Sequence, residues 1–460
     1  MGRLLTSRLI IAAALALATL GHARAQTTPA QTPAPLPQAT IAPASTQTTP
    51  QTSAPLTAPS ALPTPTPRPV FQHQGVLVQK LNGETVFEQA VDQGYNPASA
   101  IKLATALVAL RTLGPDHRFP TAVWTKGTFD QSTGTVNGDL IISGRDPSFH
   151  YEHAVLMARK LNEMGIRTVT GDLVVAPRFT MNFSSSALRS GESLYDTLDA
   201  TRRPAAAVRA WYEERVLLGD NSALQTSTPS VAVMGAVYVD SVPAGARLLF
   251  THKSSTLVDI LKVLLCYSNN FMAERLGDTL GGASGVEHFL VTQLGIPATE
   301  IHLATTSGLG VNRLSPRHMM KVYRELLDEL HEHGLSAVDI LPVAGIDPGT
   351  LQRRFATHPS RGSIVAKTGT LIRTDGGASA LVGQMRAQNG EVLLFVIFNQ
   401  RGSVPRFRNA QDALILELQA TRGGPKPFTY NPHALAMRLA DTEFDTADSE
   451  DKGEYEPTPK

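Results

Sequence analysis

Two short Asn-Gly turns, each between strand-like runs, constrain the fold of this chain more than any other feature. The stretch GVLVQKLNGETVFEQ, residues 75–89, turns at Asn82-Gly83, and ALVGQMRAQNGEVLLFVIFN, residues 380–399, turns at Asn389-Gly390. Asn-Gly between β-rich runs is a strong signal for a β-hairpin. Because the two hairpins stand at opposite ends of the folded region, with helical stretches between them, they predict an α+β fold: one antiparallel sheet flanked by helices.

The first residues of the chain have the pattern of a secretory signal peptide. Residues 1–25 combine Arg3 and Arg8 with an apolar run at 9–20 and a small-x-small cleavage site at 23–25. The apolar run is shorter than the roughly 20 residues that a membrane span needs, so we expect cleavage rather than retention as an anchor. The mature protein would then be exported to the periplasm, cell envelope or extracellular space, with no transmembrane segment.

Two further segments are set apart by their composition. Residues 26–70 are rich in Pro, Thr, Ala, Gln and Ser, a composition that buries too little apolar surface to offset the entropy of ordering. They predict a disordered Pro/Thr-rich linker. Residues 422–460 end in a stretch with eight acidic residues and two lysines, which predicts a disordered acidic tail.

The remaining segment of about 350 residues is longer than one core usually accommodates. Within it, the sequence GDLII at 138–142 is echoed by GDLVV at 171–175, with a helical stretch between them. This pattern predicts an inserted accessory domain at 124–250. Residues 71–123 and 251–421 would then form the main domain.

Charge and cysteine content exclude several classes of protein. The formal net charge is +1, without a basic stripe, which argues against a nucleic-acid partner. The only cysteine, Cys266, rules out an intramolecular disulfide and is expected to be a buried apolar residue. The pairs His150/His153 and His331/His333 lack metal-binding spacing, so both are expected on the surface, and no metal or cofactor is predicted.

Three short motifs occur in order along the chain. Ser99 and Lys102 form S-x-x-K at the start of an apolar helix, Ser268 and Asn270 form S-x-N, and residues 367–370 read K-T-G-T. A lone S-x-x-K is weak, since a second one stands in the acidic tail, but the S-x-N and K-T-G triplets each occur once. The combination is typical of penicillin-binding proteins and class A β-lactamases, although S-D-N is the usual middle motif.

These residue types suit acyl transfer. Ser99 would be the nucleophile, and Lys102, one helical turn away, would accept its proton if its pKa were lowered by burial or positive charge. Ser268 would pass a proton to the leaving amine, and Asn270 would orient the substrate amide. Lys367 is expected to hold a substrate carboxylate together with a second set of residues, Thr368, Gly369 and Thr370.

Together the motifs resemble the class C low-molecular-mass penicillin-binding proteins, which are the penicillin-binding protein 4-like D-alanyl-D-alanine carboxypeptidases and endopeptidases. The segments LGPDHRFPTAVWTKG, NGDLIISGRDPSF, SGLG and LPVAGIDPGTLQRRF extend the resemblance over residues 75–400. It implies a transpeptidase-like domain with a five-stranded sheet and an inserted accessory domain, here shortened. It also implies a serine acyl-enzyme without metal or cofactor, peptidoglycan stem peptides as substrates and β-lactams as covalent inhibitors.

The chain departs from the family in its specificity region. Asp196 stands where the family has an aspartate that contacts the stem peptide, but Thr201 replaces the usual aromatic residue. Val311 replaces the arginine that normally follows the S-G-L-S run, with Arg313 two residues further on. These changes alter positions that contact substrate side chains in the family.

Two other functions and two other residues are left open by the sequence. A serine β-lactamase would share Ser99 and Lys102, although no E-x-x-L-N stretch for rapid deacylation precedes Ser268. A non-catalytic wall-binding scaffold is the second alternative. Glu274 either supports the loop that carries Ser268 or is a surface charge, and Asp146 is expected in a turn. The sequence does not indicate the oligomeric state.

Overall fold

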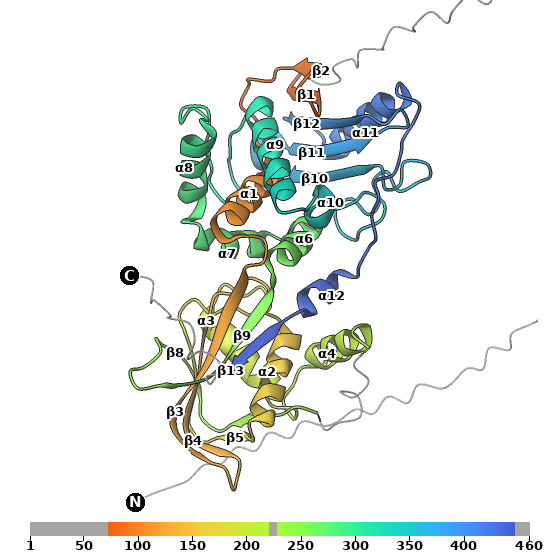
Figure 1. The fold of residues 1–460 in the computed structure, drawn as a ribbon. Helices are drawn as coiled ribbons and strands as arrows, with labels where there is room; N and C mark the ends of the chain where they lie inside the picture. The colour runs from red at the N-terminus through yellow and green to blue at the C-terminus, as the bar shows by residue number, and fades with distance from the viewer. Residues whose placement is uncertain (1–71, 220–227, 447–460) are drawn as a thin grey trace, which may run out of the picture. The chain divides into compact units, whose positions relative to one another are not determined.

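The computed structural model describes residues 72–219 and 228–446. The predicted signal peptide at 1–25, the predicted linker at 26–70 and the last residues of the predicted tail, 447–460, lie outside the described residues. Within the described residues, the chain forms two β-sheets with associated helices (Figure 1).

The first sheet has five antiparallel strands in the order β10-β11-β12-β1-β2. Its strands are β1 (Gln74–Lys80), β2 (Thr85–Gln89), β10 (Ile364–Leu371), β11 (Ala378–Arg386) and β12 (Val392–Gln400). Both predicted hairpins are present, as β1-β2 and β11-β12. The pairing of β1 with β12, in which Leu77 lies opposite Val396, joins the two ends of the folded region and confirms the predicted α+β fold.

Helices cover both faces of this sheet, which explains the nearly continuous apolar runs in its strands. Successive side chains of a strand point to opposite faces. Leu77 and Val396 therefore share a core with α1 (Lys102–Leu113) and α9 (Pro316–Glu332). Val76 and Ile397 belong instead to a core with α11 (Val404–Ala420). Figure 1 shows α9 and α11 on opposite sides of the sheet.

Further helices surround α1 and α9 and complete the larger core. They are η1 (Ala98–Ile101), α6 (Leu257–Tyr267), α7 (Asn270–Thr279), α8 (Gly282–Leu294) and α10 (Ala337–Ile340), with η2 (Thr374–Gly376) between β10 and β11. Cys266 in α6 is fully buried in this core, as expected. Burial raises the pKa of its thiol to about 12, so it has no thiolate character at neutral pH.

The second sheet has eight strands and its own core. Its strands are β3 (Arg118–Asp130), β4 (Thr135–Gly144), β5 (Thr168–Val169), β6 (Leu173–Val175), β7 (Ala232–Val233), β8 (Val237–Val239), β9 (Arg247–Thr256) and β13 (Glu443–Thr446). The helices beside it are α2 (Tyr151–Glu163), α3 (Ala187–Leu198) and α4 (Ala205–Leu217). The domain boundaries proposed at 123/124 and 250/251 fall inside β3 and β9.

The similar sequences at 138–142 and 171–175 lie in two neighbouring parallel strands, β4 and β6. A third strand, β8, pairs with β6 in the same parallel direction. Asp139 at β4 accepts a hydrogen bond from the backbone N–H of Asp172 (2.9 Å). Asp172 in turn accepts one from the N–H of Ala236 (2.8 Å). Gly171 has no room for a side chain, because a Cβ there would lie 2.3 Å from the Asp139 carboxylate. Each aspartate therefore fixes the start of the next strand.

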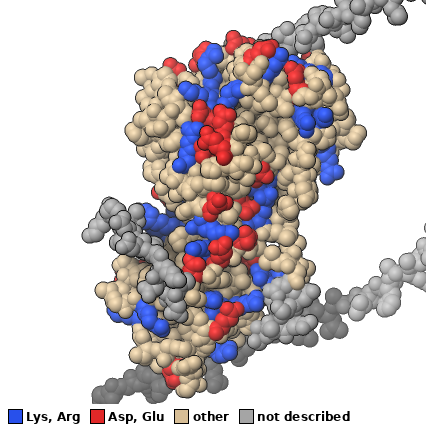
Figure 2. Space-filling model, viewed as in Figure 1, with Lys and Arg blue, Asp and Glu red and all other residues tan. Residues whose placement is uncertain are grey.

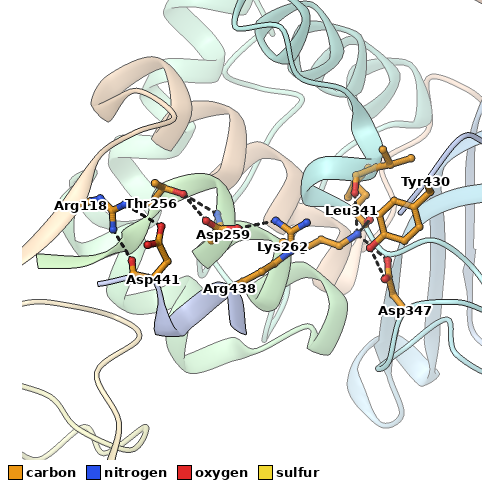
Figure 3. Close-up of polar contacts among 10 residues, drawn as sticks. Arg118, Thr256, Asp259, Lys262, Leu341, Asp347, Tyr430, Arg438 and Asp441 are labelled. Atoms are coloured by element: carbon orange, nitrogen blue, oxygen red, sulfur yellow. Dashed lines mark hydrogen bonds and ion pairs between the residues drawn. The ribbon is translucent and has the colours of Figure 1, made fainter. Parts of the chain in front are cut away.

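Residues 422–446 belong to the predicted disordered tail, but they form α12 (Leu435–Ala440) and the edge strand β13, which pairs with β9. Although the end of the segment is acidic, it also contains apolar residues that pack into the protein: Leu435 and Leu439 are buried. Polar contacts add to this packing (Figure 3): Arg438 donates to Asp259 in α6 (2.7 Å), and Arg118 in β3 donates to Asp441 (3.1 Å). The segment thus connects α6 with the second sheet.

The two histidine pairs have different outcomes. His331 and His333 are exposed, as expected. His153 was expected on the surface but is buried, because α2 presents it to Leu439 of α12, whose carbonyl oxygen lies 3.0 Å from its Nε2. Across the described residues, no three His, Cys, Asp or Glu side chains are arranged to hold a metal ion.

Two further observations concern the surface and the helices. Figure 2 shows basic and acidic side chains mixed on the face in view. None of the helices in the described part of the chain is both long enough and apolar enough to cross a membrane.

Candidate active site

Ser99 and Lys102 lie where η1 runs into α1, at one end of the larger core. Ala98, just before Ser99, has a left-handed backbone (φ +47°), an uncommon conformation for a residue other than glycine. Lys102 Nζ lies 3.0 Å from Ser99 Oγ. The structure thus brings the hydroxyl and the amine of the S-x-x-K motif into direct contact.

Lys102 is fully buried, and its surroundings favour the neutral amine. Nζ donates to the side-chain oxygen of Asn270 (2.7 Å) and to the carbonyl oxygen of Ser307 (2.6 Å). Burial lowers the pKa of Lys102 to about 7, and the negative charge of Glu274 opposes this shift. A neutral amine keeps two hydrogens for the two carbonyl oxygens, so its lone pair can accept the proton of Ser99.

Ser268 and Asn270 lie at the junction between α6 and α7. Ser268 ends α6 in a left-handed conformation (φ +56°), which turns its side chain away from the helix. Asn269 begins α7 by accepting a hydrogen bond from the N–H of Met272 (3.0 Å), and Asn270 is the first residue of that helix. The middle asparagine of the motif is therefore a helix cap, a role that aspartate also fills well.

Lys367 on the edge strand β10 lies beside Ser268. Its Nζ donates to Ser268 Oγ (2.8 Å) and to the carbonyl oxygen of Thr368 (2.7 Å). Burial, and secondarily the charge of Lys102, holds the pKa of Lys367 well below its ordinary value. Gly369 allows β10 to approach η1, because a Cβ at this position would lie 2.5 Å from the carbonyl oxygen of Pro97.

A loop at 305–310 closes the site behind Lys102. Gly308 adopts φ +84°, and a Cβ there would lie only 2.0 Å from the carbonyl oxygen of Ala98. Glu274 in α7 accepts hydrogen bonds from the N–H of Ser307 (3.1 Å) and the hydroxyl of Thr306 (2.9 Å). Glu274 therefore holds the loop that supplies the Ser307 carbonyl to Lys102, a role that differs from both alternatives that the sequence offered, since this loop is not the one that carries Ser268.

The residues of the predicted specificity region lie elsewhere. Asp196 on α3 is 44 % exposed and pairs with Arg202 (3.1 Å), in a hollow that Tyr195 and Val237 also line. Within the described residues, no hydrogen bond or ion pair joins Asp196 to the three motifs. Its place in the substrate site thus remains a prediction.

Val311 and Arg313, at and near the position of the family's arginine, provide no free positive charge either. Arg313 donates through two nitrogens to Asp375 (2.9 and 2.8 Å), so its charge is already balanced. Val311 is 45 % exposed. The structure therefore gives no free arginine at the position where the family has one.

Helix α6, which ends at Ser268, is anchored by a buried polar cluster (Figure 3). Lys262 and Asp347 are at most 1 % exposed, and Lys262 Nζ donates to Asp347 Oδ2 (2.7 Å). The hydroxyl of Tyr430 donates to the other carboxylate oxygen (2.6 Å). This cluster fixes α6 against the segment after α10 and against the C-terminal segment.

Comparisons with known proteins point to one family. The model of the D-Ala-D-Ala carboxypeptidase 3 (S13) family matches residues 66–209 and 200–421. A D-alanyl-D-alanine carboxypeptidase of Actinomadura sp. is 27 % identical and aligned over 76 % of this chain and 82 % of its own length. The corresponding Haemophilus influenzae carboxypeptidase is 24 % identical over 71 % and 83 %.

Solved structures share the fold. A predatory endopeptidase of Bdellovibrio bacteriovorus, acylated by penicillin G, superposes with a TM-score of 0.65 at 21 % identity, covering 79 % of this chain and 96 % of that one. Penicillin-binding protein 4 of Haemophilus influenzae, bound to a β-lactam, gives 0.56 at 22 % identity, covering 76 % and 97 %.

Proposed function

Because the chain belongs to the D-Ala-D-Ala carboxypeptidase 3 (S13) family, we propose that Ser99 is its nucleophile and Lys102 its general base. The resemblance to penicillin-binding protein 4-like enzymes is confirmed. The chain is a serine-type D-Ala-D-Ala peptidase that acts on peptidoglycan. The observation that carries the assignment of roles is the buried Lys102 amine, 3.0 Å from Ser99 Oγ.

In the acylation step, the neutral Lys102 amine takes the proton of Ser99 as Oγ bonds to the carbonyl carbon before the terminal D-alanine. Backbone N–H groups of Ser99 and Thr370 would stabilise the oxyanion, a contribution of about 10² to 10³ in rate for each donor. As the carbon–nitrogen bond breaks, Ser268 passes a proton to the leaving nitrogen and receives in turn the proton that Lys102 took from Ser99, so Lys102 is neutral again for deacylation. Lys367, 2.8 Å from Ser268 Oγ, keeps that hydroxyl in place by donating a hydrogen bond to it.

Deacylation reverses these roles. Lys102 takes a proton from a water molecule, whose oxygen bonds to the acyl carbon, and the bond to Ser99 Oγ breaks. Ser99 recovers its proton, and the shortened peptide leaves with a new carboxylate. Asn270 contributes in both halves, because its side-chain oxygen holds the Lys102 amine (2.7 Å) while its amide nitrogen is available to the substrate.

The same Ser99 would open the β-lactam ring, so we infer that β-lactams are covalent inhibitors of this enzyme. A peptidoglycan substrate requires a place of action outside the cytoplasmic membrane, which is supported by the signal-like residues 1–25.

The first test is the intact mass of the mature protein after brief exposure to benzylpenicillin, with Ser99→Ala as the control. We expect a persistent one-to-one adduct that is lost in the variant. A transient adduct with steady loss of the drug would instead support the β-lactamase. If no adduct forms and no drug is consumed, Ser99 is not the penicillin-reactive nucleophile.

Export is checked separately by N-terminal sequencing of the mature protein, for which we expect a first residue near Gln26.

A further inference from the structure

Arg408 on α11 reaches the end of β10, although no sequence motif includes it. Its Nη2 donates to the side-chain oxygen of Thr370 (2.8 Å). We propose that Arg408, with the hydroxyls of Thr368 and Thr370, binds the carboxylate that the leaving residue of the substrate carries next to the scissile nitrogen. This inference rests on the proposed function, because the carboxylate belongs to that substrate.

Arg408 forms no ion pair with any described residue. In the ranges 72–219 and 228–446, no carboxylate lies within ion-pair distance of its guanidinium. Asp412, one helical turn further along α11, binds Arg354 instead (3.0 Å). Partial burial and the nearby Arg354 charge lower the pKa of Arg408, and the charge of Asp412 opposes this shift. An arginine remains charged at any physiological pH, so this position favours an anion from outside.

The hydrogen-bonding capacity of Arg408 is also largely unused. A guanidinium has five N–H donors in a planar fork, and one of them is directed to Thr370. This contact also orients the Thr370 hydroxyl: its oxygen accepts from Arg408, so its own hydrogen is available, and no described residue accepts it. Two or more parallel donors are the arrangement that binds a carboxylate most strongly.

The strand places a second hydroxyl beside the first. Thr368 and Thr370 are two residues apart in β10, so their side chains lie on the same side of the strand. Lys367, between Ala366 and Thr368, points to Ser268 instead. The far side of the strand thus contributes to proton transfer, while the near side offers two hydroxyls and a guanidinium.

This position matches the substrate. In the proposed mechanism the N–H of Thr370 contacts the oxyanion, so the residue after the scissile bond lies near the end of β10. A terminal D-alanine carries its carboxylate on the carbon next to the scissile nitrogen. A peptide that continues beyond this residue has a neutral amide there. Arg408 would therefore select bonds whose leaving residue has a free carboxylate.

The test compares two substrates that differ in this one group: diacetyl-lysyl-D-alanyl-D-alanine and its C-terminal amide. We expect the unmodified enzyme to prefer the acid. Arg408→Gln should lower kcat/KM for the acid by roughly 10- to 100-fold, since hydrogen bonds to charged groups have this value, and leave the amide unchanged. Arg408→Lys should recover part of the loss, because it keeps the charge but not the fork.

The matched control is Arg406→Gln on the same helix. Arg406 is exposed, and no hydrogen bond or ion pair within the described residues involves it, so both substrates should be hydrolysed at the normal rate. If Arg408→Gln slows the acid and the amide equally, or leaves the preference for the acid intact, the carboxylate assignment is wrong.

Failure of the proposed function is detected separately. Each variant is exposed to saturating benzylpenicillin and its mass is measured. If Ser99 is acylated in the unmodified enzyme and in Arg408→Gln, the substrate comparison alone decides the role of Arg408. If the unmodified enzyme forms no adduct on Ser99, the proposed function fails, and the inference about Arg408 fails with it.

Discussion

The buried lysines of the described residues lie in two contrasting surroundings. Lys262 in α6 faces the carboxylate of Asp347 (Figure 3). Lys102 and Lys367 are equally buried, but they face hydroxyl and carbonyl oxygens. No carboxylate of a described residue lies within ion-pair distance of either amine.

The contrast separates a structural lysine from a reactive one. A buried charge is costly unless it is paired. At Lys262 the protein supplies the opposite charge and fixes a helix. At Lys102 no described carboxylate lies within ion-pair distance of the amine. The ammonium form therefore loses its proton more easily, and the pKa of Lys102 falls to about 7. The same residue type thus serves two purposes, which differ in whether an anion is within reach.

The largest effect is expected at the reactive lysine. Lys102→Met should slow acylation by benzylpenicillin by about 10² to 10⁴, the usual contribution of a positioned proton acceptor. The protein should remain folded, because no buried carboxylate loses its partner. The rate of adduct formation by mass spectrometry, together with a thermal melt, checks both parts. A rate within a factor of two of normal would remove Lys102 from the mechanism.

The structural lysine should show the opposite behaviour. Lys262→Met should reduce the free energy of unfolding by about 3–5 kcal/mol, because the charge of Asp347 stays buried and unpaired. Urea unfolding measures the loss. The double variant Lys262→Met with Asp347→Leu should recover much of it, since it removes both charges. A double variant as unstable as the single one would contradict the ion-pair explanation.

A smaller loss is expected from the third member of the buried cluster. Tyr430→Phe removes one hydrogen bond to the charged Asp347 and should cost about 1.5–3 kcal/mol in the free energy of unfolding. Tyr323→Phe is the matched control, because the Tyr323 hydroxyl is buried without a hydrogen-bond partner among the described residues. Urea unfolding of the two variants side by side should show a loss in the first and none in the second.

The smallest effect concerns pH. The neutral amine of Lys102 is the active form, so the acylation rate should fall as the pH drops through about 7. Glu274 raises the pKa of Lys102, so Glu274→Gln should move this fall to a lower pH, by less than about one unit, or 1.4 kcal/mol. A pH–rate profile of both proteins tests the sign. A shift to higher pH would contradict this role of Glu274.

The sequence predicts the parts of the site that are encoded locally. The S-x-x-K, S-x-N and K-T-G motifs place each reactive group within a few residues of its neighbour. The Asn-Gly turns identify both hairpins for the same reason. The sequence alone does not reveal that these segments meet, and the resemblance to a family supplies that step.

Contacts between distant segments have no comparable signal. Glu274 and Ser307 are 33 residues apart in the chain, and either residue alone is typical of a surface. Arg408 stands two positions from another arginine, and only the packing of α11 decides which of the two reaches Thr370. Local composition places His153 on the surface and residues 422–446 in a disordered tail. It cannot show that α2, which carries His153, packs against Leu439 of this C-terminal segment.

The Gly-Asp pair that occurs in β4 and just before β6 is not repeated before β8. Asp139 and Asp172 each provide an acceptor for the strand that follows, but the third position is Ala236, whose methyl group offers none. Unpaired strand edges can pair with further strands. At the edge formed by β8, the position that corresponds to Asp139 and Asp172 carries no side-chain acceptor. Strand β8 therefore lacks the side-chain acceptor by which β4 and β6 each hold the start of the strand beside them.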